Sequence, residues 1–215
     1  MSSSANPVNA RRGQLFIVAA PSGGGKTSLV TAMLAADEKL ALSVSHTTRK
    51  PRSSEENGKQ YHFIDKTEFN DLVSKNAFLE HATVFGNDYG THAGALENQL
   101  ESGLDVILEI DWQGAAQVRK IFPDCCSIFI LPPAMETLRL RLSRRAQDSI
   151  EVIESRMRDA RAEISHWAEF DYLVINKNFD IALQELQSII HCVRDGRICS
   201  HDQHAQLLAQ ELGNG

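Results

Sequence analysis

The fold is decided by the stretch Leu15-Phe16-Ile17-Val18-Ala19-Ala20-Pro21-Ser22-Gly23-Gly24-Gly25-Lys26-Thr27. It begins with a continuous apolar run and stops at a proline and three glycines, which is typical of a strand that is buried on both faces and ends in a loop. After Thr27, apolar residues recur at helical spacing at Leu29, Val30, Met33 and Leu34. The local order is therefore predicted to be strand, glycine-rich loop, helix.

The glycine-rich loop fits the phosphate-binding pattern at every fixed position except the first, where alanine replaces glycine. Its glycines can adopt positive φ, so that consecutive N–H groups converge on phosphate oxygens in front of a helix N-terminus. Lys26 supplies a mobile charge for the β- and γ-phosphates, and the hydroxyl of Thr27 is placed to ligate Mg²⁺. The alternative is a glycine-rich turn with a solvated lysine, which the flanking strand and helix disfavour. We expect ATP to be bound by Ala20, Pro21, Ser22, Gly23, Gly24, Gly25, Lys26 and Thr27.

Apolar runs and helical patterns alternate along the rest of the chain. Further strands are expected at 105–111, 127–131 and 172–175, and helices at 135–145, 150–167 and 181–193. This alternation predicts βαβ units and a mainly parallel sheet, hence an α/β fold. Two segments differ from it. Residues 45–94 are polar and rich in turns, as in an inserted lobe, and residues 139–166 are rich in arginine, as in a solvated helical hairpin.

A second anion site is suggested by the basic segment from Ser45 to Arg52. Arg49 and Arg52 flank a proline, and a phenol, Tyr61, follows nine residues after Arg52, an arrangement that suits a phosphate monoester held by guanidinium groups. A basic run is more usually a solvated surface, and the residues by themselves leave both interpretations open. Downstream, Glu80 offers a carboxylate that could accept hydrogen bonds from the paired N1–H and amine of guanine, an edge that adenine lacks. The alternative is a glutamate on a surface helix.

Bulk composition excludes several classes of protein. The 215 residues are 42% hydrophobic and carry a net charge of -6, so nucleic acid is a poor first guess and an anionic nucleotide must be held by local positive groups. The four cysteines match neither zinc-ligand nor redox spacing, and no apolar stretch is long enough to span a bilayer. We therefore expect a cytoplasmic protein with reduced thiols and no membrane partner. A homo-oligomer is compatible with the sequence.

Taken together, the motifs resemble the guanylate kinases, and most of all their bacterial branch. The resemblance covers roughly residues 13 to 195 in one collinear order. The motifs that carry it are Ala-Pro-Ser-Gly-x-Gly-Lys-Thr at 20–27, Val44-Ser45-His46-Thr47-Thr48-Arg49-x-Pro51-Arg52, Phe78-Leu79-Glu80-His81-Ala82, Tyr89-Gly90-Thr91, Ile110-Asp111-Trp112-Gln113-Gly114 and Ile130-Leu131-Pro132-Pro133.

The resemblance implies a P-loop NTPase core with a parallel sheet flanked by helices, an inserted GMP-binding lobe of mixed α+β structure, and a helical lid. The core would comprise 13–44, 95–138 and 167–205, the lobe 45–94 and the lid 139–166, with tails at 1–12 and 206–215. The implied activity is transfer of the γ-phosphoryl group of ATP to GMP with Mg²⁺. Two alternatives remain open: a guanylate-kinase-like interaction module that has lost catalysis, and a kinase with another acceptor such as AMP. The intact loop argues against the first and Glu80 against the second.

The resemblance also implies roles for individual residues. The GMP phosphate would be held by Arg49, Arg52, Tyr61 and Tyr89, the guanine would be surrounded by Ser45, Glu80, Thr91 and Asp111, and Glu55 would organise the lobe. Besides Lys26, the catalytic set would include the lid arginines Arg141, Arg145 and Arg156, and Asn176 would lie beside the adenine. Because this chain has Arg144-Arg145-Ala146 where the family commonly has Gly-Arg-Gly, the choice between the first two arginines is open. Apart from the resemblance, Asp111 and Glu109 stand at the end of a core strand and are candidates for contact with Mg²⁺ or Lys26, the alternative being ordinary acids at a strand end.

Overall fold

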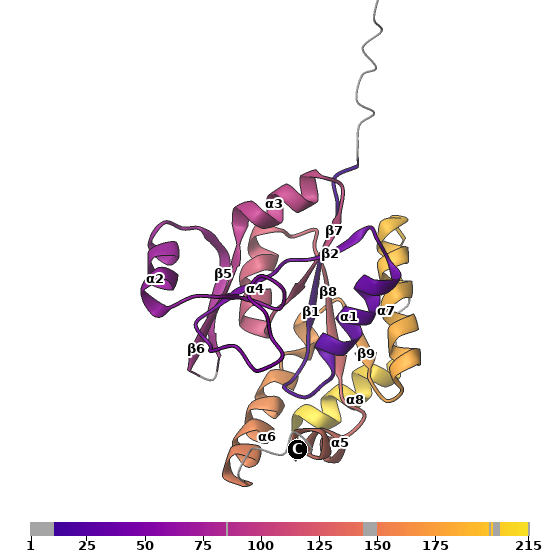
Figure 1. Cartoon of the computed structure of the whole chain (residues 1–215). Coiled ribbons are helices and arrows are strands. Elements are labelled where there is room, and N and C mark those ends of the chain that lie inside the picture. The colour runs from indigo at the N-terminus through magenta and orange to yellow at the C-terminus, as the bar shows by residue number, and fades with distance from the viewer. Residues whose placement is uncertain (1–10, 85, 144–149, 198, 200–202, 215) are drawn as a thin grey trace, which may run out of the picture.

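The computed structural model describes residues 11–84, 86–143, 150–197, 199 and 203–214 of the chain. Its core is a five-stranded parallel sheet in the order β2-β7-β1-β8-β9 (Figure 1). These strands are β1 (Leu15–Ala19), β2 (Leu40–Leu42), β7 (Asp105–Glu109), β8 (Cys126–Leu131) and β9 (Tyr172–Ile175). The predicted α/β fold with a parallel sheet flanked by helices is thereby confirmed.

Both faces of the sheet are covered, which explains why its strands read as continuous apolar runs. On the central strand β1, Leu15, Ile17 and Ala19 belong to one buried cluster, and Phe16 and Val18 belong to the other. The first cluster is closed by α3 (Ala93–Glu101), α4 (Trp112–Ile121), α5 (Met135–Ser143), α6 (Ile150–Ile164) and α8 (Gln203–Asn214). The second is closed by α1 (Lys26–Ala36) and α7 (Phe179–Arg194), which lie side by side in Figure 1.

A second, four-stranded sheet in the order β4-β3-β6-β5 makes up most of the polar segment that was expected to form an inserted lobe. Its elements are β3 (His46–Thr47), β4 (His62–Phe63), α2 (Lys66–Ser74), β5 (Phe78–Val84) and β6 (Asn87–His92). The lobe projects to the left of the core in Figure 1, and β5 packs against α4 of the core. The lobe is therefore joined to the core through the contact of β5 with α4 and of β5 and β6 with α3.

The arginine-rich segment 139–166 contains the end of α5 and the whole of α6, and these two helices pack against each other at the bottom of Figure 1. A short 3₁₀ helix, η1 (Trp167–Glu169), connects α6 to β9. The segment 206–215, expected as a tail, lies largely in a terminal helix, α8, which packs on α6 and β9. The short strand β2 and the helices α3 and α4 were not predicted from the sequence.

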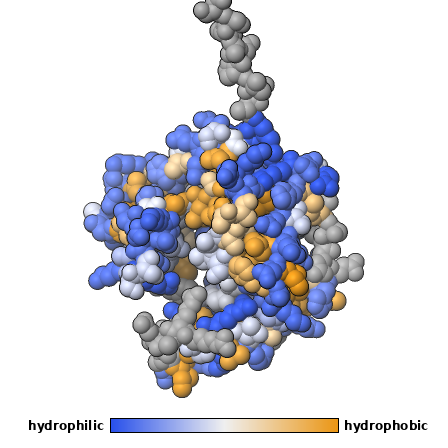
Figure 2. All heavy atoms as spheres, turned by 45° about the vertical axis from the view of Figure 1, so that its right-hand side comes forward, coloured by the Kyte–Doolittle hydropathy of each residue, from blue (hydrophilic) through white to orange (hydrophobic). Residues whose placement is uncertain are grey.

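The face shown in Figure 2 is hydrophilic around its margins, and hydrophobic side chains gather in a band across its middle. Among the described residues, the structure contains no helix long and apolar enough to cross a membrane.

Candidate active site

The glycine-rich loop between β1 and α1 has the conformation that its glycines allow. Gly23 and Gly25 have φ angles of 86° and 94°, in the left-handed region where a side chain would be strained, and Gly25 is the N-cap of α1. Within the loop, the amide of Gly24 donates to the carbonyl of Pro21 at 2.8 Å. A Cβ on Gly25 would lie 2.3 Å from Nδ2 of Asn176, so glycine is required there for packing as well as for conformation.

The two polar residues that begin α1 are tied to the neighbouring strand β7. Lys26 Nζ donates to the carbonyl of Ile110 at 3.0 Å, and Thr27 Oγ1 donates to Glu109 Oε1 at 2.5 Å. Parallel pairing of β1 with β7 brings Glu109 opposite Val18, just before the loop. The carboxyl end of β7 and the start of α1 therefore place an ammonium group, a hydroxyl and a carboxylate at one point.

Asn176, which follows β9, and Arg141, on α5, also contact the loop. Asn176 is 5% exposed, and its Nδ2 donates to the carbonyl of Gly24 at 2.8 Å. Arg141, on α5, donates to the carbonyls of Gly24 and Asn176 at 3.3 and 3.0 Å. Both side chains thus hold the backbone of the loop in this structure.

In the lobe, Arg49 is held by a bidentate ion pair. Its Nη1 and Nη2 donate to the two carboxylate oxygens of Glu55 at 2.9 Å each, and Glu55 also accepts from the backbone amide of Arg52 at 2.7 Å. The guanidinium carbon lies 5.5 Å from the ring centroid of Tyr61, which in turn lies 5.8 Å from the ring of Tyr89. Paired guanidinium and carboxylate groups fix each other's geometry. Glu55 therefore orients the guanidinium group of Arg49 beside the ring of Tyr61, while Arg52 keeps an exposed side chain.

Glu80 is buried in strand β5, so the alternative of a surface helix glutamate is wrong. Its side chain is 3% exposed and accepts from Thr91 Oγ1 at 2.6 Å across the β5–β6 pair. Burial raises the pKa of Glu80 to about 7, the hydrogen bond from Thr91 opposes this, and the charge of Asp111 adds to it. Asp111 itself caps α4 by accepting from the amide of Gly114 at 2.9 Å. A Cβ on Gly114 would lie 2.5 Å from Glu80 Oε2, so this glycine leaves the space that the carboxylate occupies.

A single cleft joins the loop to the lobe. Its lining from the core includes the whole glycine-rich loop from Ala20 to Thr27, together with Glu109 and Asp111. From the lobe and from helix α6, it is lined by Ser45, Arg52, Tyr61, Glu80, Tyr89 and Arg156. The predicted loop and the basic segment thus face one space rather than opposite sides of the molecule. Behind this lining lie Arg49, Glu55 and Thr91, which contact Tyr61, Arg52 and Glu80 as described above.

The guanylate kinase family model matches residues 12–192 of the chain. The chain belongs to the guanylate kinase family. It is 58% identical over 177 residues to the guanylate kinase of Alkalilimnicola ehrlichii, covering 82% of this chain and 87% of that protein. It is 57% identical over 202 residues to that of Psychrobacter arcticus, covering 94% and 97%. The crystal structure of guanylate kinase from Anaplasma phagocytophilum superposes with a TM-score of 0.72 at 34% identity, covering 88% of this chain and 89% of that one.

Of the three arginines that the resemblance assigns to a lid, the structure describes two. Arg156 on α6 lines the cleft, and Arg141 on α5 contacts the loop backbone. Arg145 and its neighbour Arg144 lie outside the described residues.

One residue of the cleft, Glu163, was not predicted from the sequence. Glu163, on α6, accepts from the backbone amide of Ser22 at 3.0 Å and lines the cleft. Burial raises its pKa to about 7, against the hydrogen bond from Ser22 and the charge of Lys26. The available signal was spacing, since Glu163 follows Arg156 by seven residues, two helical turns, and so shares its face of the helix.

Proposed function

We propose that the two halves of this cleft carry out the reaction of a guanylate kinase, transfer of the γ-phosphoryl group of ATP to GMP to give ADP and GDP. The single observation that supports this most strongly is the shared cleft, in which a phosphate-binding loop and a lobe with guanidinium, phenol and carboxylate groups line one space. Phosphoryl transfer needs alignment and charge neutralisation more than covalent help from the protein. A cleft with an anion site at each end can supply both.

In this proposal, ATP binds at the loop. Backbone amides of the glycine-rich loop, the positive end of α1 and Lys26 would hold its β- and γ-phosphates. Asn176 and Arg141 would contribute by keeping the loop in shape, because both bond its backbone at Gly24. The adenine contact that the resemblance implies for Asn176 stays a prediction.

Mg²⁺ is the expected metal ion, and the residues at the loop fit it. The donor pair of Thr27 Oγ1 and Glu109 Oε1 consists of hard oxygen ligands, and no cluster of three or more His, Cys, Asp or Glu side chains suited to a metal exists among the described residues. Mg²⁺ in nucleotide kinases characteristically takes one or two protein oxygens, with substrate phosphates and waters completing its shell. Bound with ATP, it would neutralise charge on the transferring phosphates. We propose Thr27 as its ligand and Glu109 as the group that orients the Thr27 hydroxyl.

GMP would bind in the lobe with its phosphate toward the loop. Arg52, Tyr61 and Tyr89 line the cleft and would contact the phosphate directly, and Arg49 would join them without losing its orientation by Glu55. Placement by already ordered side chains lowers the entropic cost of aligning the acceptor.

The base would be read by Glu80, with Ser45, Thr91 and Asp111 around it. An ionised carboxylate accepts both the N1–H and the amine of guanine, whereas adenine would present an acceptor to it. The buried position makes this discrimination strong, because an unpaired carboxylate is costly away from water.

The lobe at 45–94 and the lid at 139–166 are proposed to close over the two nucleotides, which would exclude water as a competing acceptor. Closure would bring Arg156, and Arg141 or Arg145, to the transferring phosphates, where forked guanidinium groups stabilise developing charge.

A coupled ADP-release assay with GMP, AMP, CMP and UMP as acceptors tests this proposal. Of these four acceptors, only GMP is expected to give turnover. Turnover with AMP but not GMP would refute the substrate assignment, and GMP binding without ADP release would indicate an interaction module instead.

A further inference from the structure

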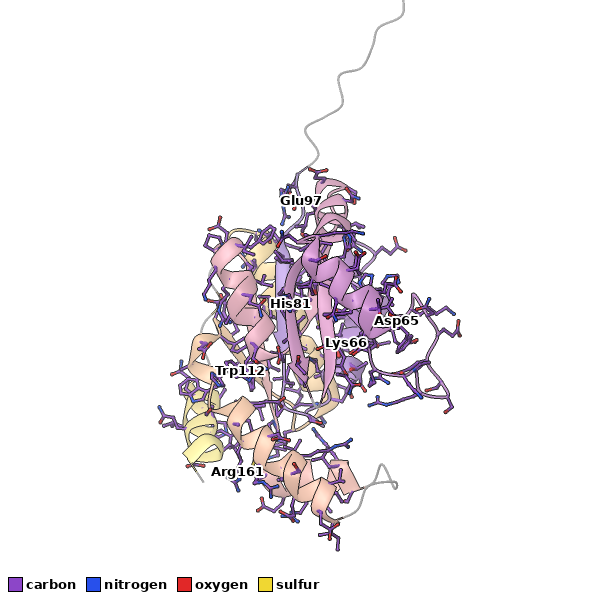
Figure 3. The ribbon with its side chains drawn as sticks, turned by 90° about the vertical axis from the view of Figure 1, so that its left-hand side faces the viewer. Asp65, Lys66, His81, Glu97, Trp112 and Arg161 are labelled. Carbon is purple, nitrogen blue, oxygen red and sulfur yellow. The ribbon has the colours of Figure 1, made fainter. Side chains whose placement is uncertain are left out.

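The lid helix α6 is fixed to the core at its C-terminal end. His166 stacks on Trp112 with ring centroids 3.5 Å apart, and the following 3₁₀ helix is tied to α4 by an ion pair of 2.9 Å between Arg119 and Glu169. Figure 3 shows Trp112, at the start of α4, directly above α6, the helix that carries Arg161. Motion of the lid would therefore pivot near this end of α6.

Glu163 lies one turn before this fixed end and reaches into the cleft. Its carboxylate accepts the backbone N–H of Ser22, in the arm of the phosphate-binding loop that leads from β1 to the glycines. Helical geometry places Arg156 two turns away along the same face, about 10 Å farther from the pivot, and this residue also lines the cleft. One helix face thus presents both a contact with the loop and an arginine for the phosphates.

We propose that Glu163 is a positioning residue that fastens the loop arm at Ser22 to the pivot of the lid helix, so that the loop and Arg156 keep a fixed spacing. This inference rests on the proposed function, because it assumes that ATP binds at the loop. The donor in this hydrogen bond is the main-chain N–H of Ser22, which stays the same when its side chain is exchanged. The contact is therefore tested by changing the acceptor, Glu163.

The contact does not require a charged acceptor. The charged groups around the Glu163 carboxyl are Lys26 and Asp111 from the core and Asp159 on its own helix, and burial is the largest influence on its protonation. Protonation of a carboxyl group leaves one carbonyl oxygen that still accepts a hydrogen bond. The fastening therefore persists whether the group is ionised or neutral.

Two substitutions separate the acceptor from the charge. Glu163→Gln keeps an acceptor oxygen and removes the charge, whereas Glu163→Met has a similar length, suits a helix and has no acceptor for the Ser22 amide. Glu101→Gln is the matched control, because Glu101 is an exposed glutamate at the end of α3, away from the cleft.

The first readout is steady-state kinetics with the full chain at saturating GMP. Glu163→Met is expected to lower kcat about tenfold and to raise the KM for ATP, with the Kd for GMP changed less than twofold. Glu163→Gln and the control should stay within about twofold of wild type in all three constants. Equal loss of activity in the Gln and Met variants would overturn the proposal, because the charge would then matter rather than the hydrogen bond. Wild-type kinetics in the Met variant would also overturn it.

The second readout needs no substrate and no turnover. Hydrogen exchange of the Ser22 amide, followed by NMR, should be at least about tenfold faster in Glu163→Met than in wild type or Glu163→Gln. Equal exchange in all three proteins would overturn the proposal even if the Met variant were too unstable for kinetics. Failure of wild type to release ADP in the presence of GMP would instead contradict the proposed function, and the exchange comparison would still decide the role of Glu163.

Discussion

Replacing Glu80 by glutamine should stabilise the protein while weakening GMP binding. The side chain is 3% exposed, and its burial raises the pKa from 4.5 to about 7. A difference of this size between the unfolded and folded pKa corresponds to about 3 kcal/mol of unfolding free energy. Because the pKa of Glu80 is raised in the folded state, folding favours the neutral carboxyl group. The resulting stability is fully present below pH 4.5 and is lost as the pH rises through about 7.

Glutamine has the size of glutamate and can accept the hydrogen bond from Thr91, but it does not ionise. We therefore expect Glu80→Gln to be more stable than wild type by about 3 kcal/mol at pH 8.5, and to differ from it by less than about 1 kcal/mol at pH 4.5. Denaturant unfolding followed by circular dichroism at both pH values measures the difference. Other groups that titrate in this range, including Glu163, are present in both proteins and cancel in the comparison.

The control is Glu101→Gln, whose stability relative to wild type should not vary with pH by more than about 0.5 kcal/mol, as expected for an exposed side chain. A Glu80→Gln variant that is no more stable at pH 8.5 than at pH 4.5, relative to wild type, would refute the idea that the guanine site holds a carboxylate at a cost to folding. Calorimetric titration of the same variant should show GMP binding weakened by more than tenfold and ATP binding nearly unchanged.

Three further substitutions test other parts of the site. Lys26→Ala should abolish measurable ADP release while leaving the Kd for GMP within about twofold in calorimetric titration; loss of GMP binding as well would show that the two sites are not separate. Gly114→Ala should raise the KM for GMP by more than tenfold but not that for ATP, because its Cβ would lie 2.5 Å from Glu80 Oε2; an unchanged KM for GMP would mean that the carboxylate does not need this space. Arg49→Lys should raise the KM for GMP roughly tenfold, because an ammonium group cannot make the bidentate pair with Glu55, and wild-type GMP kinetics would argue against that pair as the organiser of the lobe.

The sequence predicted the core well because its signals are local. The apolar run before the glycines became β1, and helix α1 begins at Lys26 as expected. The helix at Trp112–Ile121 was missed because the residues that it buries, Gly114, Ala115 and Val118, are mostly small and give a weak apolar pattern. Strand β2 was missed for a different reason, since three residues are too few to show a periodic pattern.

The sequence named residues that the structure brings to one cleft, but not the contacts between them. The basic segment was ambiguous on its own, and only the pairing of Arg49 with Glu55 shows that it is an ordered part of the lobe. Glu163 and Ser22 are 141 residues apart, and no local pattern signals a hydrogen bond between a helix side chain and a loop amide at that separation. Such contacts depend on the packing of α6 against the core, which sequence periodicity does not specify.

The central claim is that two anion sites face each other across one gap, and a bisubstrate ligand tests it directly. Adenosine and guanosine joined through five phosphates should occupy both sites at once, since the linked second half binds at a high effective concentration. Calorimetric titration is expected to give a Kd at least about a hundredfold lower than that of ATP alone, with the gain abolished in Glu80→Gln. A Kd equal to that of ATP, with free GMP still binding to the saturated protein, would contradict the account.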